Sequence, residues 1–165
     1  MEKVIVKSLE KESDHSFIQT EQEISANRDV LSNIRKKLGI ISLRSDADLV
    51  RLVEEQLPLG VISALVKHGL QEKEIYNLVL PRRTLQHRRA RKEKLTREES
   101  DRAVRLARLV ALTERVFGDA KAGMDWLRAP KMRYSGRAPI KLMATETGAR
   151  LVEEMLHQID QGLAA

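Results

Sequence analysis

Apolar residues recur at helical spacing along most of the chain from residue 27 onward, and helix start and stop signals repeatedly interrupt them. This spacing gathers apolar side chains on one face of a helix. Aromatic residues make up only 3% of the chain, whereas Leu, Ala, Glu, Arg and Lys are abundant, a composition that favours helices over strands. We therefore predict an all-α protein.

The start and stop signals give the helix boundaries. Asp48 follows Ser45 by three residues, and Glu99 follows Thr96 by three, which is the spacing of a capping box. Gly118 stands where a helix C-terminus is expected. Residues 1 to about 25 have sparse apolar residues without a sustained period, and we expect them to form a flexible arm. The predicted helices are 27–38, 46–57, 61–68, 72–79, 82–91, 97–117, 120–127, 139–143 and 146–161.

The positive charge of the chain is concentrated in one segment. The net charge is +6, and residues 82–97 contain eight Lys and Arg but a single acid, Glu93, so this segment carries +7. The other residues therefore sum to −1. A solvated helix usually interleaves acids with its bases, so the imbalance favours a site for a polyanion, although a merely solvated face is the simpler alternative.

The same segment completes the plan of a helix-turn-helix. The predicted helices 72–79 and 82–91 are joined by a tight turn, and in such a unit the second helix enters the major groove of DNA. The cationic segment contains no aromatic residue on which unpaired bases could stack, which favours duplex DNA over single strands. The candidate DNA-binding residues are Arg83, Thr84, Gln86 and His87 for the base edges, Arg88, Arg89, Arg91 and Lys92 for the phosphates, and Arg82 beside them.

No catalytic or metal-binding constellation can be assembled from the sequence. The chain has no Cys, which excludes disulfides, thiolate zinc sites and a Cys nucleophile. Its 4 His residues are scattered, and there is no glycine-rich phosphate loop or nucleophile motif. No apolar stretch reaches membrane-spanning length. We therefore expect a cytoplasmic protein that is not an enzyme, holds no cofactor or metal, and has no membrane partner.

A segment rich in Pro and Gly follows the predicted helix that ends near Leu127. It is long for a connection in a protein of this size, and such loops are often functional. Its Met132, Tyr134 and Arg137 have the apolar, aromatic and cationic character of interface hot spots. We expect a protein partner to order this loop and Trp126 to support it, although a core role is the simpler interpretation of Trp126.

Several motifs, taken in order, carry a family resemblance. They are Lys94-Leu95-Thr96-Arg97-Glu98-Glu99-Ser100-Asp101-Arg102, Glu114-Arg115-Val116-Phe117-Gly118-Asp119, Trp126-Leu127 and Gly136-Arg137-Ala138-Pro139. Together they resemble the Xre/MbcA/ParS antitoxins over roughly residues 45–165. The stretches 144–149 and 158–162 look like the C-terminal toxin-binding domain of that family.

The resemblance implies an antitoxin of a type II toxin–antitoxin system. Members pair an Xre-like DNA-binding region with a C-terminal domain that neutralises a RES-domain toxin, an enzyme that degrades NAD or uses it for ADP-ribosylation. We accordingly expect residues 1–44 to be the arm and a short helix, residues 45–118 to dimerise and bind operator DNA, and residues 119–165 to bind the toxin in a hetero-oligomer. Such a protein represses its own operon. The alternative is a stand-alone helix-turn-helix repressor whose C-terminal domain only dimerises.

The resemblance also points to a toxin-binding tail. In the family, the C-terminal helix and tail approach the active-site cleft of the toxin and occlude it. The matching positions here are Leu156, Ile159, Gln161, Gly162, Leu163, Ala164 and Ala165. With Trp126, Met132, Tyr134 and Arg137, they are the candidate toxin-binding residues.

Overall fold

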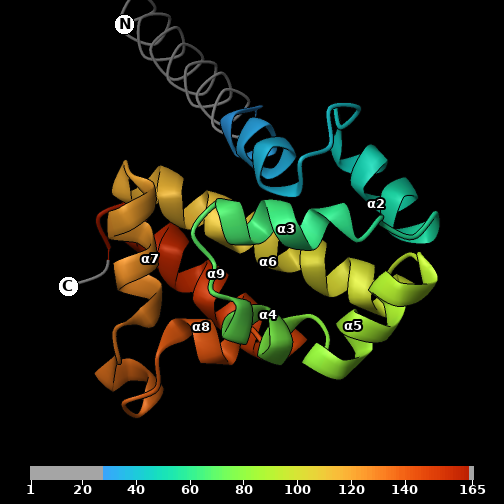
Figure 1. The fold of residues 1–165 in the computed structure, drawn as a ribbon. Coiled ribbons are helices and arrows are strands. Elements are labelled where there is room, and N and C mark those ends of the chain that lie inside the picture. The colour runs from blue at the N-terminus through green and yellow to red at the C-terminus, as the bar shows by residue number, and fades with distance from the viewer. Residues whose placement is uncertain (1–27, 164–165) are drawn as a thin grey trace, which may run out of the picture.

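The computed structural model describes residues 28–163, and the regular elements in this range are helical (Figure 1). The prediction of an all-α protein is confirmed for these residues, whereas the predicted flexible arm lies outside them. None of the described helices is long and apolar enough to span a bilayer. The elements are a helix over residues 28–38, α2 (Asp46–Glu54), α3 (Gly60–Lys67), α4 (Glu72–Leu78), α5 (Arg82–Arg91), α6 (Arg97–Phe117), α7 (Ala120–Arg128), the 3₁₀ helix η1 (Met132–Tyr134), α8 (Pro139–Leu142) and α9 (Glu146–Asp160).

The predicted capping residues start the helices. At α2, the Ser45 side chain accepts from the backbone of Asp48 at 3.2 Å, and the Asp48 carboxylate accepts from the backbone of Ser45 at 3.0 Å. Thr96 and Glu99 form the same reciprocal pair at α6, and Asp119 caps α7. Local side chains thus satisfy N–H groups that the first turn of a helix leaves free.

Helix α2 is shorter than predicted. It ends at Glu54, and Gln56 then adopts a left-handed backbone with φ 63°. Leu57 is therefore not part of the apolar face of α2, but it is buried in the turn that follows. The Leu57 backbone N–H donates to the buried Ser100 hydroxyl at 3.0 Å, so this turn is fixed to the first turns of α6.

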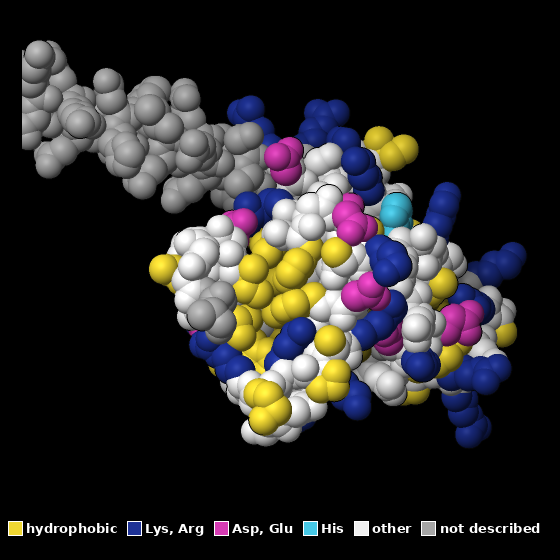
Figure 2. Space-filling view, turned by 90° about the vertical axis from the view of Figure 1, so that its left-hand side faces the viewer, with side chains coloured by type: hydrophobic (Ala, Val, Ile, Leu, Met, Phe, Trp, Pro, Cys, Tyr) yellow, Lys and Arg dark blue, Asp and Glu magenta, His cyan; other side chains and the backbone are white. Residues whose placement is uncertain are grey.

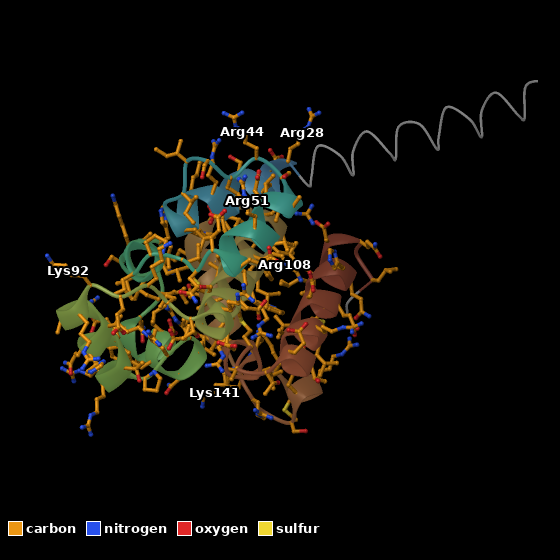
Figure 3. The ribbon with its side chains drawn as sticks, turned by 90° about the vertical axis from the view of Figure 1, so that its right-hand side faces the viewer. Arg28, Arg44, Arg51, Lys92, Arg108 and Lys141 are labelled. Atoms are coloured by element: carbon orange, nitrogen blue, oxygen red, sulfur yellow. The ribbon has the colours of Figure 1, made fainter. Side chains whose placement is uncertain are left out.

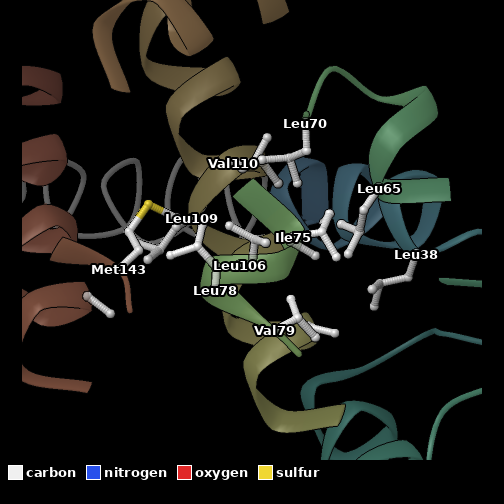
Figure 4. Close-up of a cluster of buried hydrophobic side chains, with 14 of the residues drawn as sticks. Leu38, Leu65, Leu70, Ile75, Leu78, Val79, Leu106, Leu109, Val110 and Met143 are labelled. Atoms are coloured by element: carbon white, nitrogen blue, oxygen red, sulfur yellow. The ribbon is translucent and has the colours of Figure 1, made fainter. Parts of the chain in front are cut away.

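Helix α6 is the central element of the molecule. It is 21 residues long, and α2, α3, α4, α7 and α9 all pack on it (Figure 1). Figure 4 shows Leu106, Leu109 and Val110 of α6 between Ile75 on one side and Met143 on the other. The buried apolar residues form a single continuous cluster that joins both halves of the chain.

The helix over residues 28–38 belongs to this packed body. Ile34 and Leu38 are buried in the common core. Lys37 is only 3% exposed, and its Nζ lies 2.5 Å from Oε2 of Glu114 on α6. A buried ammonium is costly unless it is paired, so this contact fixes the helix against the C-terminal part of α6.

A substitution at Gly148 tests how closely α8 and α9 pack. A Cβ at this position of α9 would overlap the carbonyl oxygen of Leu142 at the end of α8. We expect Gly148→Ala to lower the free energy of unfolding by about 1–3 kcal/mol, because the two backbones must move apart. Gly60→Ala is the matched control, since nothing lies within 4 Å of its Cβ position. Urea denaturation followed by circular dichroism measures both, and equal midpoints would contradict the close packing.

Candidate functional site

Helices α4 and α5 form the predicted helix-turn-helix pair. The turn between them is buried at Val79 and Leu80, and the guanidinium of Arg102 on α6 donates to the Val79 carbonyl at 3.2 Å. On α4, the Tyr76 hydroxyl donates to the Glu72 carboxylate at 2.8 Å, and this hydrogen bond raises the pKa of Tyr76. The core and α6 therefore fix the angle at which α5 leaves the turn.

Helix α5 directs most of its predicted DNA-binding side chains to solvent. Its buried anchor is Leu85, and Thr84 is half-buried beside it. A helix of 10 residues with one buried apolar anchor leaves its opposite face free for a partner. The exposed candidates are Arg82, Arg83, Gln86, His87, Arg89, Arg91 and Lys92.

Arg88 does not lie on that exposed face, contrary to its predicted phosphate contact. Its Nε lies 3.0 Å from Oε2 of Glu99, and its Nη1 lies 3.3 Å from Oε2 of Glu93. The same Nη1 donates to the Lys94 carbonyl at 3.2 Å. Because Glu99 also closes the capping box of α6, one buried carboxylate fixes both the start of α6 and the orientation of α5. Arg88 is thus a structural residue.

Two further cations of the charged segment hold the end of α2. Lys94 Nζ donates to the Glu55 carbonyl at 3.1 Å, and Arg97 Nε donates to the Glu54 carbonyl at 3.4 Å. Cations are favourable at a helix C-terminus, where carbonyl groups lack partners. Besides Arg88, Lys94 and Arg97, which contact other parts of the fold, the segment exposes five cations: Arg82, Arg83, Arg89, Lys92 and Arg91, whose Nη1 lies 3.8 Å from Oε1 of Glu93.

The loop between α7 and α8 is folded onto α9 through hydrogen bonds within this chain. Lys131 donates its backbone N–H to the Arg137 carbonyl at 3.1 Å, which closes the loop around η1. Arg133 donates to the Gln158 side chain at 2.8 Å. The Tyr134 hydroxyl donates to the Leu151 carbonyl at 3.0 Å, and burial raises the pKa of Tyr134.

Trp126 links this loop to the core. The ring is half-buried on α7, with its centroid 5.5 Å from that of Phe117 at the end of α6. Lys131 Nζ lies 5.2 Å from the Trp126 centroid, within range of a cation–π interaction. One aromatic side chain therefore connects α6, α7 and the start of the loop.

The remaining toxin-binding candidates divide between surface and core. Met132 is 90% exposed at the loop and Leu163 is 72% exposed after α9. Figure 2 shows a hydrophobic area on the side of the molecule that carries α7 and the C-terminus, with Lys and Arg beside it. Leu156 is 0% exposed, so it packs in the core and we remove it from the contact surface. Arg137, Gln161 and Gly162 are exposed and Ile159 is half-buried, whereas Ala164 and Ala165 lie outside the described residues.

Arg128 forms a bridge between the two halves that sequence reasoning missed. Its Nε lies 2.8 Å from Oε1 of Glu74, and its Nη2 donates to Oε2 of Glu74 at 2.9 Å and to the Gly69 carbonyl at 2.8 Å. This hydrogen bonding with Glu74 raises the pKa of Arg128. Glu74 Oε2 also accepts from the backbone of Gln71 at 2.7 Å, as part of the capping box of α4. The end of α7 is therefore fixed to the start of α4.

Neither surface contains a group suited to bind a metal. Among residues 28–163, no three His, Asp or Glu side chains are grouped closely enough to hold an ion. Both surfaces present cationic or apolar side chains to solvent, which is the chemistry of binding a partner.

Comparisons with known proteins match these two surfaces to two domains. Residues 48–108 match the antitoxin Xre-like helix-turn-helix domain, and residues 112–162 match the antitoxin Xre/MbcA/ParS C-terminal toxin-binding domain. The chain is 31% identical over 155 residues to "Antitoxin Xre" of Pseudomonas putida, covering 94% of this chain and 98% of that relative. The chain belongs to the Xre antitoxin family. It is also 32% identical over 85 residues to "Antitoxin Xre" of Yersinia enterocolitica, covering 51% of this chain and 57% of that relative.

Membership of the Xre family confirms the expected class of protein: an antitoxin of a toxin–antitoxin system that contains a helix-turn-helix domain. The part of the chain that resembles the family is longer than the predicted range of residues 45–165. An alignment of 155 residues must include part of the chain before residue 45. The α4–α5 pair lies in the helix-turn-helix match, and α7, the loop and α9 lie in the toxin-binding match.

Substitutions of the adjacent residues Arg88 and Arg89 test whether Arg88 has a structural role and Arg89 a surface role. We expect Arg88→Ala to lower the free energy of unfolding by about 1–3 kcal/mol, because it leaves the largely buried Glu99 without its cation. Arg89→Ala removes an exposed side chain from the same helix and should change stability by less than about 0.5 kcal/mol. Urea midpoints of the two variants give the comparison, and an Arg88→Ala protein as stable as Arg89→Ala would refute the structural assignment.

Proposed function

We propose that this antitoxin acts through two separate surfaces. Its α5 face binds a palindromic operator as a homodimer and represses its own operon, and its C-terminal face covers the active site of a RES-domain toxin that consumes NAD. The observation that carries the proposal is that one body with a shared core presents an exposed cationic helix in the helix-turn-helix match and an exposed apolar loop and tail in the toxin-binding match. Both activities place the protein in the cytoplasm.

The exposed side chains of α5 suit duplex DNA. Arg83, Gln86 and His87 stand near the start and middle of the helix and provide donors for base edges in the major groove. Arg89 and Arg91 stand near its end, where they suit phosphates. Lys92, which caps α5 in a left-handed conformation, and Arg82 add to this phosphate-binding charge, and the half-buried Thr84 lies at the edge of the exposed face.

The C-terminal face suits steric inhibition. Met132 projects from a loop that is already fixed by Arg133 and Tyr134, so little conformational entropy is lost when a partner binds it. Beyond α9 the chain turns at Gly162, with φ 70°, and then exposes Leu163. A tail that fills an NAD pocket needs no reactive group of its own, so the antitoxin forms a hetero-oligomer with the toxin without catalysing a reaction.

Substitutions on α5 test the operator-binding role. We expect Arg83→Ala to cost about 1–3 kcal/mol of discrimination between the operator and random duplexes, because a base-edge contact is lost. Arg91→Ala should weaken binding to both DNAs and reduce the salt slope by about one, because a phosphate contact is lost. Fluorescence anisotropy across a salt series measures both effects on DNA from upstream of the gene.

Lys121→Ala is the control for the DNA measurements. Lys121 is an exposed cation on α7, paired with Asp125 at 2.8 Å, and its removal should leave DNA affinity unchanged. If all three variants changed specific and random binding equally, the assignment of base-reading and phosphate-binding positions would be refuted.

Substitutions at the C-terminal face test the toxin-binding role. A chain that stops after Gln161 keeps the ion pair between Asp160 and Arg115 but loses the tail, and we expect it to lose inhibition of the cognate toxin. Met132→Asp should lower toxin affinity at least tenfold, because it places a charge in an apolar contact. NAD consumption by the purified toxin, titrated with antitoxin, measures both, and full inhibition by the truncated chain would refute the tail mechanism. Operator binding should be unchanged in both variants.

A further inference from the structure

The exposed loop residue Met132 lies within a second segment of concentrated positive charge. Residues 129–145 contain no Asp or Glu and four cations: Lys131, Arg133, Arg137 and Lys141. They carry +4, and residues 82–97 carry +7, so the rest of the chain sums to −5 for the net charge of +6. The positive charge of the protein is therefore gathered in two places, residues 82–97 and what we call segment 129–145.

The acids of the helix that follows do not neutralise segment 129–145. Three of the four acids of α9 pair with arginines of α6: Glu146 with Arg105, Glu153 with Arg108 and Asp160 with Arg115. The charge of the fourth, Glu154, acts on Tyr134 and offsets at most one of the cations. Among the side chains that the structure describes, none of the four cations of segment 129–145 forms an ion pair with a carboxylate. The segment therefore keeps a net positive charge.

Neutral groups hold the first two cations of segment 129–145. Arg133 donates to the Gln158 side chain at 2.8 Å, and Lys131 Nζ lies 5.2 Å from the centroid of the Trp126 ring. The other two cations are exposed. Figure 2 shows Lys and Arg beside a hydrophobic area on this side of the molecule. A neutral partner fixes a cation without cancelling its charge, so segment 129–145 presents a positive surface to solvent.

An exposed apolar side chain among these cations favours a protein partner over DNA. Met132 lies between Lys131 and Arg133 in the sequence and is 90% exposed. Helix α5, in contrast, has no large apolar side chain among the exposed residues of the described chain. An apolar centre with a charged rim is typical of a protein interface, whereas a phosphate backbone is contacted by cations and hydrogen-bond donors. Segment 129–145 also lies entirely within the toxin-binding match, residues 112–162.

We propose that segment 129–145 binds an acidic surface of the toxin and that its cations steer this surface onto Met132. This inference rests on the toxin-binding role of the proposed function and adds the chemistry that the partner must present there, which is carboxylates around an apolar patch. Exposed charges act mainly on the rate of association, whereas the packing of an apolar side chain acts on the rate of dissociation. Kinetic measurements therefore separate the two contributions.

Charge reversal in segment 129–145 tests the proposal. At an ionic strength of about 0.1 M, Arg137→Glu combined with Lys141→Glu should lower the association rate constant for the purified cognate toxin roughly tenfold and leave the dissociation rate constant unchanged. At about 1 M, where the Debye length is about 3 Å, the variant and the wild type should associate equally fast. Arg137 closes the loop through its backbone, which the substitution retains. Surface plasmon resonance with the full-length chain measures both rate constants.

Arg28→Glu combined with Arg44→Glu is the matched control. Both arginines are exposed and lie outside the toxin-binding match, and their reversal changes the net charge by the same amount. Figure 3 shows them on the side of the molecule opposite Lys141. Because steering depends on where the charges lie, this variant should associate with the toxin within about twofold of the wild-type rate. An equal slowing of the two double variants would overturn the proposal, since the effect would then reflect net charge alone.

The outcomes separate this inference from the proposed function. A wild-type chain that does not bind the toxin overturns the toxin-binding role and this inference together. A toxin whose association rate depends neither on salt nor on the reversal of Arg137 and Lys141 overturns this inference alone, while Met132→Asp still tests the toxin-binding face. Operator DNA is measured with the same variants. A loss of operator affinity as large as the loss of toxin association would assign segment 129–145 to DNA and overturn the proposal.

Discussion

The burial of α6 is the constraint on which the rest of the structure depends. The two matched segments, 48–108 and 112–162, contain 61 and 51 residues, sizes at which a separate domain buries only about 60% of its surface. Leu106, Leu109 and Val110 of α6 instead give both segments one shared core. The helix-turn-helix half and the C-terminal half therefore stabilise each other through this shared core.

Residues 82–97 stabilise the fold as well as provide exposed positive charge. Arg88, Lys94 and Arg97 use their charges to fix α5 and the end of α2, while their neighbours on α5 face solvent. Glu99 is central to this division, because its carboxylate both caps α6 and binds Arg88. A dense run of arginines can thus set the position of a recognition helix as well as provide its charge.

Features of the fold that are set by neighbouring residues could be predicted from the sequence. The capping pairs Ser45–Asp48 and Thr96–Glu99, and the apolar spacing of α6, located the helices and the helix-turn-helix. The failures involve residues distant in sequence. Glu93 is close in sequence to both Arg88 and Arg89, and what separates the two arginines is the contact of Arg88 with Glu99 on the next helix. Leu156 shares the apolar face of α9 with Val152, and both are 0% exposed, so helical spacing places Leu156 inward and only the family resemblance assigned it to the toxin. The fold of the loop depends on tertiary packing, since helical periodicity alone gives no information on contacts between elements.

The bridge from Arg128 to Glu74 and Gly69 has a thermodynamic consequence. It joins the end of the helix that precedes the exposed loop to the first turn of the helix-turn-helix, with each of its hydrogen bonds at 2.8 or 2.9 Å. A ligand that displaces one end of this connection changes the hydrogen bonds at the other end. Linkage is reciprocal: whatever factor an occupied loop applies to operator affinity, an occupied operator applies to the affinity of the loop for its ligand.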